Sequence, residues 1–142
     1  MMHAQSILRV VAKLLIPYLL LFGLYVQFHG DYGPGGGFQA GVIIAAAFIL
    51  YGLVFGLRAA RRAAPPAVIE ALIALGVLLY AGTGVVTMML GGNFLEYGVL
   101  DRQRPVHGQH LGILIVELGV GITVATVMIS IFFSFAGRQR VP

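Results

Sequence analysis

The stretch FQAGVIIAAAFILYGLVFGL, residues 38–57, contains no charged side chain. A helix needs about 20 consecutive apolar residues to cross the hydrocarbon core of a bilayer. The stretch also lacks the regular alternation of apolar and polar residues that is typical of a membrane β-strand. It therefore predicts a transmembrane helix.

Three more apolar segments accompany this one, at residues 7–28, 67–90 and 111–135. The chain has 142 residues, of which 59% are hydrophobic and 10% charged, whereas soluble domains average about 45–50% apolar and about 25% charged residues. The first segment resembles a signal peptide, but no small-residue cleavage site follows it, so we interpret it as a retained helix. We expect an all-α integral membrane protein in which residues 1–142 form a single domain of four transmembrane helices, arranged as two hairpins.

Positive charge is distributed unevenly among the segments that connect these helices. The connection between the third and fourth segments carries Arg102 and Arg104 beside Glu96 and Asp101. Because cytoplasmic segments of membrane proteins carry an excess of Lys and Arg, the pattern predicts a multi-pass protein of the cell (inner) membrane with both termini in the cytoplasm. We interpret the basic residues as determinants of topology and expect no nucleic-acid partner. The other cations lie in the N-terminal, C-terminal and central connecting segments: Arg9, Lys13, Arg58, Arg61, Arg62, Arg138 and Arg140.

The glycine-rich stretch HGDYGPGGGFQAG, residues 29–41, connects the first two segments. Glycine loops that bind phosphate follow a strand and end in Lys and Ser or Thr. This stretch has none of these features, which argues against a nucleotide site. Pro34 fixes one φ angle, and Gly35, Gly36 and Gly37 allow positive φ angles for a tight re-entry into the membrane.

Glycines also recur at intervals of four residues, at Gly33, Gly37 and Gly41 and again at Gly52 and Gly56. Small residues at this spacing allow helix backbones to touch inside a membrane. We therefore expect the second helix to pack closely against another helix, which belongs either to this chain or to another chain.

Two carboxylates fall within the predicted spans. Glu117 lies about two turns into the fourth segment, where placing an acid in hydrocarbon costs roughly 2.5–3.5 kcal/mol. Such a residue is either part of an ion path or a protonated acid that makes an interhelical hydrogen bond, and Gly119 and Gly121 beside it favour a close partner helix. Glu70 lies about one turn into the third segment, where the helix dipole stabilises a carboxylate. A structural role is the simpler interpretation of Glu70.

The histidines form no convincing metal site. His107 and His110 are three residues apart, which suits one face of a helix, but no cysteine or third ligand accompanies them. His29 and Asp31 form a weak candidate for a pH-sensitive pair at the outer face. We expect no metal, no cofactor and no enzymatic activity, because neither a haem-ligating histidine pair nor a Ser–His–Asp arrangement lies within the spans.

The segment HGDYGPGGGFQAGVIIAAAFILYG resembles a hallmark of the MnhB-like subunits of the multisubunit Na⁺/H⁺ antiporters, those of the Mrp, Mnh or Pha type. The later segment HGQHLGILIVELGVGITVATVMISIFF is similar to the fourth helix of these small subunits. The resemblance covers essentially the whole chain. The residues that match the loop hallmark are Gly30, Pro34, Gly35, Gly36, Gly37 and Phe38, with Gly41 shortly after them.

This resemblance implies a small membrane subunit of a complex that exchanges cytoplasmic Na⁺, or in some members K⁺, for external H⁺. Large subunits related to the membrane arm of respiratory complex I would then be its partners and would carry most of the proton path. The small number of carboxylates in the spans agrees with this, because a complete proton path is hard to build from this chain alone. Glu117 and Glu70 are the ion-path candidates, and the loop glycines are expected to serve subunit contacts.

Two alternatives remain open at this stage. The first is an autonomous small proton-coupled transporter that acts as a homo-oligomer, although the first span contains no acid after Lys13. The second is a subunit that works purely by packing and does not contact the ion.

Overall fold

The computed structural model describes residues 2–29 and 36–138, with side chains from Gln5 onward. Four helices in this part of the chain are long and apolar enough to cross a membrane, and the described residues contain no strand. The all-helical fold expected from the sequence is thereby confirmed. The four helices are α1 (Met2–His29), α2 (Gly37–Phe55), α4 (Pro66–Met89) and α5 (Pro105–Ala136).

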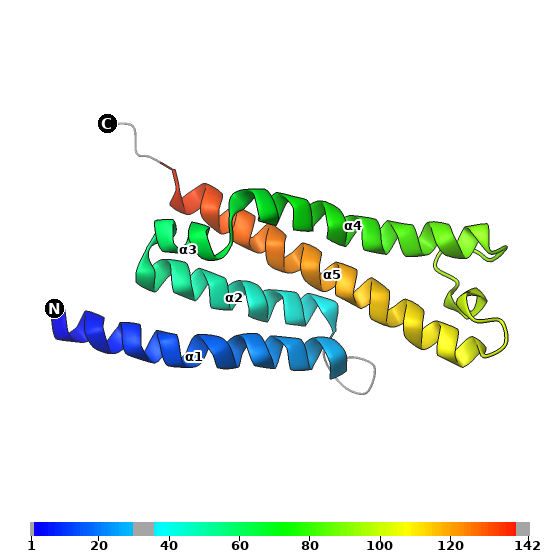
Figure 1. Cartoon of the computed structure of the whole chain (residues 1–142), viewed down its shortest axis with the longest axis horizontal. Coiled ribbons are helices and arrows are strands. Elements are labelled where there is room, and N and C mark those ends of the chain that lie inside the picture. Colours follow the sequence, from blue (N-terminus) through cyan, green and yellow to red (C-terminus); the bar gives the residue numbers. More distant parts are fainter. Residues whose placement is uncertain (1, 30–35, 139–142) are drawn as a thin grey trace.

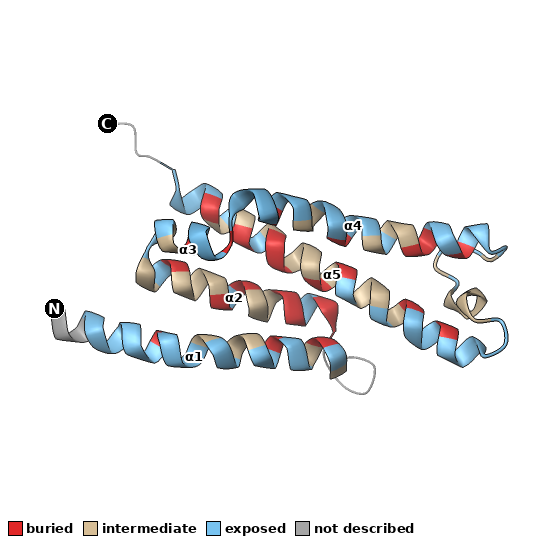
Figure 2. Ribbon diagram, viewed as in Figure 1, coloured by how far each residue is buried: buried red, intermediate tan, exposed pale blue. Residues whose placement is uncertain are grey.

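Helix α5 is the centre of the bundle. It packs against α4 on one side and against α2 on the other, while α1 packs mainly against α2 (Figure 1). Buried residues accordingly follow α2 and α5, whereas most of α1 is exposed (Figure 2). In a membrane protein these exposed apolar faces point toward lipid or toward other helices.

The bundle has two different ends. The start of α1 and the end of α5 lie at one end, together with the short helix α3 (Leu57–Ala63), and we call this the terminal end (Figure 1). The opposite end, which we call the loop end, carries the connection between α4 and α5 and its short 3₁₀ helix η1 (Tyr97–Leu100) (Figure 1). Of the described connecting segments, the arginine-rich one therefore lies at the same end as the start of α1.

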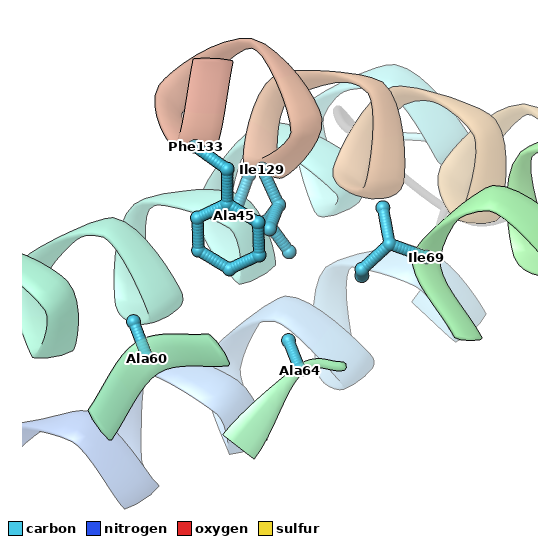
Figure 3. Packing of buried hydrophobic residues seen from close by; sticks show 6 residues of the cluster. All are labelled: Ala45, Ala60, Ala64, Ile69, Ile129 and Phe133. Carbon is cyan, nitrogen blue, oxygen red and sulfur yellow. The ribbon is translucent and has the colours of Figure 1, made fainter. Parts of the chain in front are cut away.

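The main hydrophobic cluster lies at the terminal end. There α3 and the start of α4 fold back onto α2 and α5, and Lys13 and Arg61 lie over the rings of Phe55 and Phe133 at 5.5 and 5.9 Å. The small, buried side chain of Ala60 allows α3 to approach α2 and α5 closely. Figure 3 shows the buried members of the cluster, which are Ala45, Ala60, Ala64, Ile69, Ile129 and Phe133.

The helix boundaries differ from the sequence prediction by more than one residue in three places. The first helix begins at Met2 and not at residue 7. The fourth span begins at Pro105 and not at residue 111, because Pro105 starts the helix and the polar residues that follow it remain helical. The second span ends at Phe55 and not at residue 57. Gly56 adopts a φ of 95°, a left-handed conformation that favours glycine, and α3 begins directly after it.

The conformation expected for the loop glycines was wrong at Gly36 and Gly37. Gly36 has an extended φ of 169°, and Gly37 is the first residue of α2. Among the described glycines, the positive φ angles occur at Gly56 and Gly91. Gly30, Pro34 and Gly35 lie outside the described residues, as does Asp31, so the predicted His29–Asp31 pair stays a prediction.

Candidate functional site

The first turn of α2 lies directly against Glu117 in the middle of α5. A Cβ atom on Gly37 would collide with the backbone carbonyl oxygen of Glu117 and would lie 3.1 Å from the backbone nitrogen of Gly121. One residue earlier, a Cβ on Gly36 would lie 3.4 Å from the Oε1 atom of the Glu117 side chain. The half-buried carboxyl group of Glu117 therefore adjoins the N-terminus of α2.

This placement has an electrostatic consequence. The N-terminal turn of a helix presents unpaired N–H groups and a partial positive charge, which stabilise a nearby negative charge by about 0.3–1 kcal/mol at exposed sites and up to about 2 kcal/mol at partly buried ones. Gly36 and Gly37 have no side chains to hold the carboxyl group away from these backbone groups. The local sequence Gly-Gly-Phe thus brings an acid on α5 to the positive end of α2.

The contact continues one turn further along both helices. A Cβ on Gly41 would lie 2.8 Å from the carbonyl oxygen of Gly121 and 2.8 Å from the Cβ of Val124. The expectation that the second helix packs closely through its glycines is met at Gly37 and Gly41, and the partner is α5 of the same chain. Gly56 takes no part, because nothing lies within 4 Å of a Cβ built there.

On the opposite face of α5, glycines likewise allow close packing against α4. The carbonyl oxygens of Gly76 and Gly119 each lie 2.9 Å from the position of a Cβ on the other residue, and a Cβ on Gly76 would also collide with the hydroxyl of Thr123. Thr123 donates that hydroxyl to the carbonyl of Gly119 at 2.7 Å, within its own helix. The other atoms nearest to these two glycines belong to Thr123, to Leu79 and to the backbone of Tyr80, and none of them is a carboxylate.

The helices on the two sides of Glu117 end at different levels. Helix α2 begins beside Glu117, whereas α5 extends for twelve more residues toward the loop end, or about 18 Å. Gly76, near the middle of the 24-residue helix α4, packs beside Gly119. Glu117 therefore lies at the level of the first residues of α2 but at the level of the middle of α4. Helices α4 and α5 extend further toward the loop end than α1 and α2 do (Figure 1).

Glu70 occupies a different environment. It is exposed, and it lies just beyond the first turn of α4, near the terminal end. Within the described residues it makes no ion pair with Arg61 or Arg62. The structure thus separates the two span carboxylates, and Glu117 is the one that adjoins the glycine-rich loop motif.

The loop end holds His107 and His110, the pair that the sequence offered as a weak metal-site candidate. His107 Nδ1 lies 3.2 Å from the carboxylate of Asp101, and the other oxygen of Asp101 accepts hydrogen bonds from the backbone N–H groups of Gln103 and Arg104 at 3.2 and 3.1 Å. No group of three or more His, Asp or Glu residues suited to a metal occurs among residues 2–29 and 36–138. Asp101 orders the start of α5 and pairs with His107.

The α4–α5 connection is packed onto the helices through further glycines. The rings of Phe94 and Tyr97 occupy the space that a Cβ on Gly84 or Gly112 would need. Burial raises the pKa of the Tyr97 phenol, and the neighbouring Tyr80 raises it further. The connection is thus an ordered cap on the loop end.

Gln27 is a buried polar residue that the sequence does not reveal as buried. Gln27, near the end of α1, is only 4% exposed, and its Oε1 atom lies against the position of a Cβ on Gly121. In the described part of the chain, its Nε2 group has no hydrogen-bond partner. A glutamine close to the end of an apolar segment looks like an interfacial residue, and only the packing of α1 against α5 shows that it is buried.

Comparison with known proteins identifies the family. A family model described as a domain related to the MnhB subunit of Na⁺/H⁺ antiporters matches residues 7–130. The chain belongs to this family. Relatives described as "putative antiporter subunit mnhB2", from Staphylococcus aureus strains Newman and JH1, are each 35% identical to it over 141 residues, which cover 98% of this chain and 99% of the relative.

Membership in the MnhB family confirms the resemblance drawn from the glycine-rich loop and the fourth span. It assigns the chain to antiporter subunits, which are transport proteins rather than enzymes. The four apolar helices fit a multi-pass membrane protein of this family.

Proposed function

We propose that this chain is a small integral subunit of a multisubunit antiporter. The complex would exchange a monovalent cation, Na⁺, for H⁺. The chain would lie in the cell membrane with its terminal end in the cytoplasm. Its partners would be the other membrane subunits, including large subunits related to those of respiratory complex I. Within this complex, Glu117 would line the ion path where α2 begins.

The observation that carries the proposal is the position of Glu117. The acid is half-buried in the longest apolar span, and glycines bring it to the positive end of α2. An ionisable residue inside a membrane segment is costly, and such residues mark ion and proton pathways by default. A group that changes its charge beside a helix N-terminus is suited to hold and release a proton or a small cation.

The proposed need for partners follows from the scarcity of such groups. Glu117 and Glu70 are the only acids in the four spans, and Glu70 is exposed near the terminal end. Helix α1 contributes no acid at all. A continuous path for protons and cations would therefore require ionisable groups from neighbouring subunits.

The proposed orientation rests on the distribution of charge. Among the described cations, Arg102 and Arg104 belong to the loop end, and the others belong to the terminal end. The positive-inside rule then directs the terminal end to the cytoplasm and the glycine-rich loop to the outer side.

The test is the isosteric variant Glu117→Gln, with Glu70→Gln as the matched control. We expect Glu117→Gln to abolish cation/proton exchange in membrane vesicles while a tag on this chain still recovers the other subunits. Glu70→Gln should leave both exchange and assembly unchanged. Full exchange by an assembled Glu117→Gln complex would refute the ion-path role. Loss of assembly would instead identify Glu117 as an anchor for a neighbouring helix.

The same purification separates the complex from the autonomous alternative. Mass spectrometry of material recovered in mild detergent should identify large antiporter-like membrane subunits. Recovery of this chain alone as a stable homo-oligomer, with proton-coupled flux after reconstitution, would support an autonomous transporter instead.

A further inference from the structure

The charged residues near the two ends of α5 give the depth of Glu117 in the membrane. Arg104 directly precedes α5, and Arg61 lies over the ring of Phe133 near its end. The length of helix from Arg104 to Phe133 is about 44 Å, which matches the thickness of a bilayer with its headgroup regions, about 40–45 Å. Glu117 is about 20 Å from Arg104 and about 24 Å from Phe133 along the helix. It therefore lies close to the middle of the membrane.

Helices α1 and α2 also end near this depth. Gly36 and Gly37, at the start of α2, adjoin Glu117. On α1, the side chain of Gln27 packs beside Gly121, one turn of α5 from Glu117, and α1 ends shortly after Gln27. In the described part of the chain, both helices thus stop near the middle of the membrane, whereas α5 continues for about 18 Å toward the loop end with α4 beside it (Figure 1).

Polar groups gather where α1 ends and α2 begins. The first N–H groups of α2 have no side-chain cap, because Gly36 occupies the capping position. The buried Nε2 group of Gln27 has no hydrogen-bond partner among the described residues, and the carboxyl group of Glu117 lies at the same level. Helix ends occur at such a depth only where protein buries them or where they line a water-filled cavity. Lipid alone is therefore excluded as the surroundings of these groups.

Apolar packing separates Glu117 from the terminal end. Gly37 and Gly41 bring α2 into close contact with the backbone of α5. The groove that begins at Gln27 and runs toward α3 is lined mostly by apolar side chains, and Thr126 in its lining donates its hydroxyl within its own helix. The hydrophobic cluster follows at the terminal end (Figure 3). The described residues therefore favour no route for water between Glu117 and the terminal end.

Toward the loop end, helices α1 and α2 do not cover the side of α5 that carries Glu117. Leu114 and His110 lie on this side, one and two turns beyond Glu117, because residues three, four or seven positions apart share a helix face. Both are exposed. The α4–α5 connection packs against a different side of α5, at Gly108 and Gly112.

We propose that water and cations reach Glu117 from the outer side of the membrane, through a water-filled recess beside α5 between Glu117 and His110. This rests on the proposed function, since an acid that exchanges protons or cations must be reachable from water. The recess admits hydronium and hydrated monovalent cations from the loop end. The apolar packing blocks their passage through this chain to the cytoplasm, so the inner half of the path belongs to a neighbouring subunit.

Cysteine labelling in the assembled complex tests the proposal. The chain contains no cysteine, so a single introduced cysteine is the only thiol that this chain presents. Leu114 and Leu118 form a matched pair, because they are 36% and 38% exposed and lie on opposite sides of Glu117 along α5. A membrane-impermeant cationic thiol reagent is added to the outside of intact cells. Labelling is then measured on this chain after purification through a tag, and recovery of the other subunits checks assembly.

We expect Leu114→Cys to be labelled at least about tenfold faster than Leu118→Cys, because the reactive thiolate forms in water and is suppressed in apolar surroundings. His110→Cys, nearer the loop end, should also be labelled from outside. Ile113→Cys on the same side replaces Leu114→Cys if that variant does not assemble. Equal labelling of the two leucine positions would overturn the proposal, as would labelling of Leu114→Cys only from the cytoplasmic side of inverted vesicles. Absence of labelling at both would show that a neighbouring subunit covers this side of α5, and would also overturn it.

The labelling does not depend on transport, so it separates this proposal from the proposed function. If Leu114→Cys is not labelled while Glu117→Gln abolishes exchange, the recess is removed and the ion-path role stands. If Leu114→Cys is labelled from outside while the Glu117→Gln complex exchanges normally, the recess stands and the ion-path role is removed.

Discussion

Helix α5 packs closely against both α2 and α4 through glycines, but the two contacts lie at different positions along the partner helices. On the α4 side, Gly76 and Gly119 bring the backbones together in the middle of both helices, and the nearby hydroxyl of Thr123 is already bonded within α5. On the α2 side, Gly37 meets α5 at the first residue of α2, beside the carboxyl group of Glu117. One contact is purely a packing contact, whereas the other leaves an ionisable group at a helix terminus.

This difference separates fold from function within one helix. Close approach through glycine needs only small residues on both partners, and it works equally well in the middle of a helix or at its end. An acid is useful for transport only where its charge can change, and a helix N-terminus stabilises the charged form. The α2–α5 contact is therefore the place where the packing of the bundle and the proposed ion path coincide.

The largest expected effect is at Gly37. The variant Gly37→Ala should destabilise the protein by about 2–3 kcal/mol, because the new methyl group meets the backbone of Glu117 and α2 must move away from α5. Thermal unfolding in detergent measures the loss. The control Gly82→Ala places a methyl group in open space within α4, and it should be neutral or stabilise by up to about 1 kcal/mol. Similar unfolding temperatures for the two variants would contradict the expected difference between a glycine in close contact with α5 and a glycine beside open space.

A smaller effect, which a second substitution should relieve in part, is expected at Gly76. Gly76→Ala should cost about 1–2 kcal/mol, since the nearest atom to the new methyl group is the hydroxyl oxygen of Thr123. The double variant Gly76→Ala/Thr123→Ala should recover about 1 kcal/mol in a double-mutant cycle. The matched pair Gly41→Ala/Val124→Ala should recover less, because Val124→Ala keeps the Cβ atom that lies 2.8 Å from the methyl group, whereas Thr123→Ala removes the atom nearest to the methyl group at position 76. Equal recovery in both cycles would contradict the comparison.

The cap on the α4–α5 hairpin gives a third test. The fully buried hydroxyl of Thr87 accepts a hydrogen bond from the N–H of Leu95 at 2.9 Å, where Leu95 adopts a strained φ of 62°. Thr87→Val should therefore destabilise the protein by about 1–2 kcal/mol. Thr83→Val, whose hydroxyl bonds only to Leu79 of its own helix, should cost less. Hydrogen exchange at residues 90–104 should rise in the first variant and stay unchanged in the second.

The smallest effect is expected at the exposed pair between Asp101 and His107. His107→Gln should change stability by less than about 1 kcal/mol, because exposed ion pairs contribute little. Asp101→Ala should cost about 1 kcal/mol, since it also removes the acceptor for the backbone N–H groups of Gln103 and Arg104, which directly precede α5. Chemical unfolding of both variants checks the order, and a larger loss for His107→Gln would show that the ion pair matters more than these backbone hydrogen bonds.

Some features were within reach of the sequence and were still missed. Helix α3 has the sequence LRAARRA, and alanine and arginine are both strong helix formers. It was interpreted as a loop because the positive-inside rule concerns charge and not conformation. The start of α5 at Pro105 was missed because residues 105–110 are too polar to count toward an apolar span, although proline is favoured at the first position of a helix.

The sequence by itself determined the number of spans, their approximate ends and the family, because apolar length and local motifs are properties of the chain alone. It also identified glycine faces that needed close partners. The tertiary structure decided which helix each face meets, that Gly36 and Gly37 adjoin Glu117, and that Gln27 is buried. Each of these depends on contacts between residues far apart in the sequence, from 43 positions for Gly76 and Gly119 to 94 positions for Gln27 and Gly121. Glycine spacing defines a surface that another helix can approach closely, but only the simultaneous packing of all four helices around α5 selects the partner.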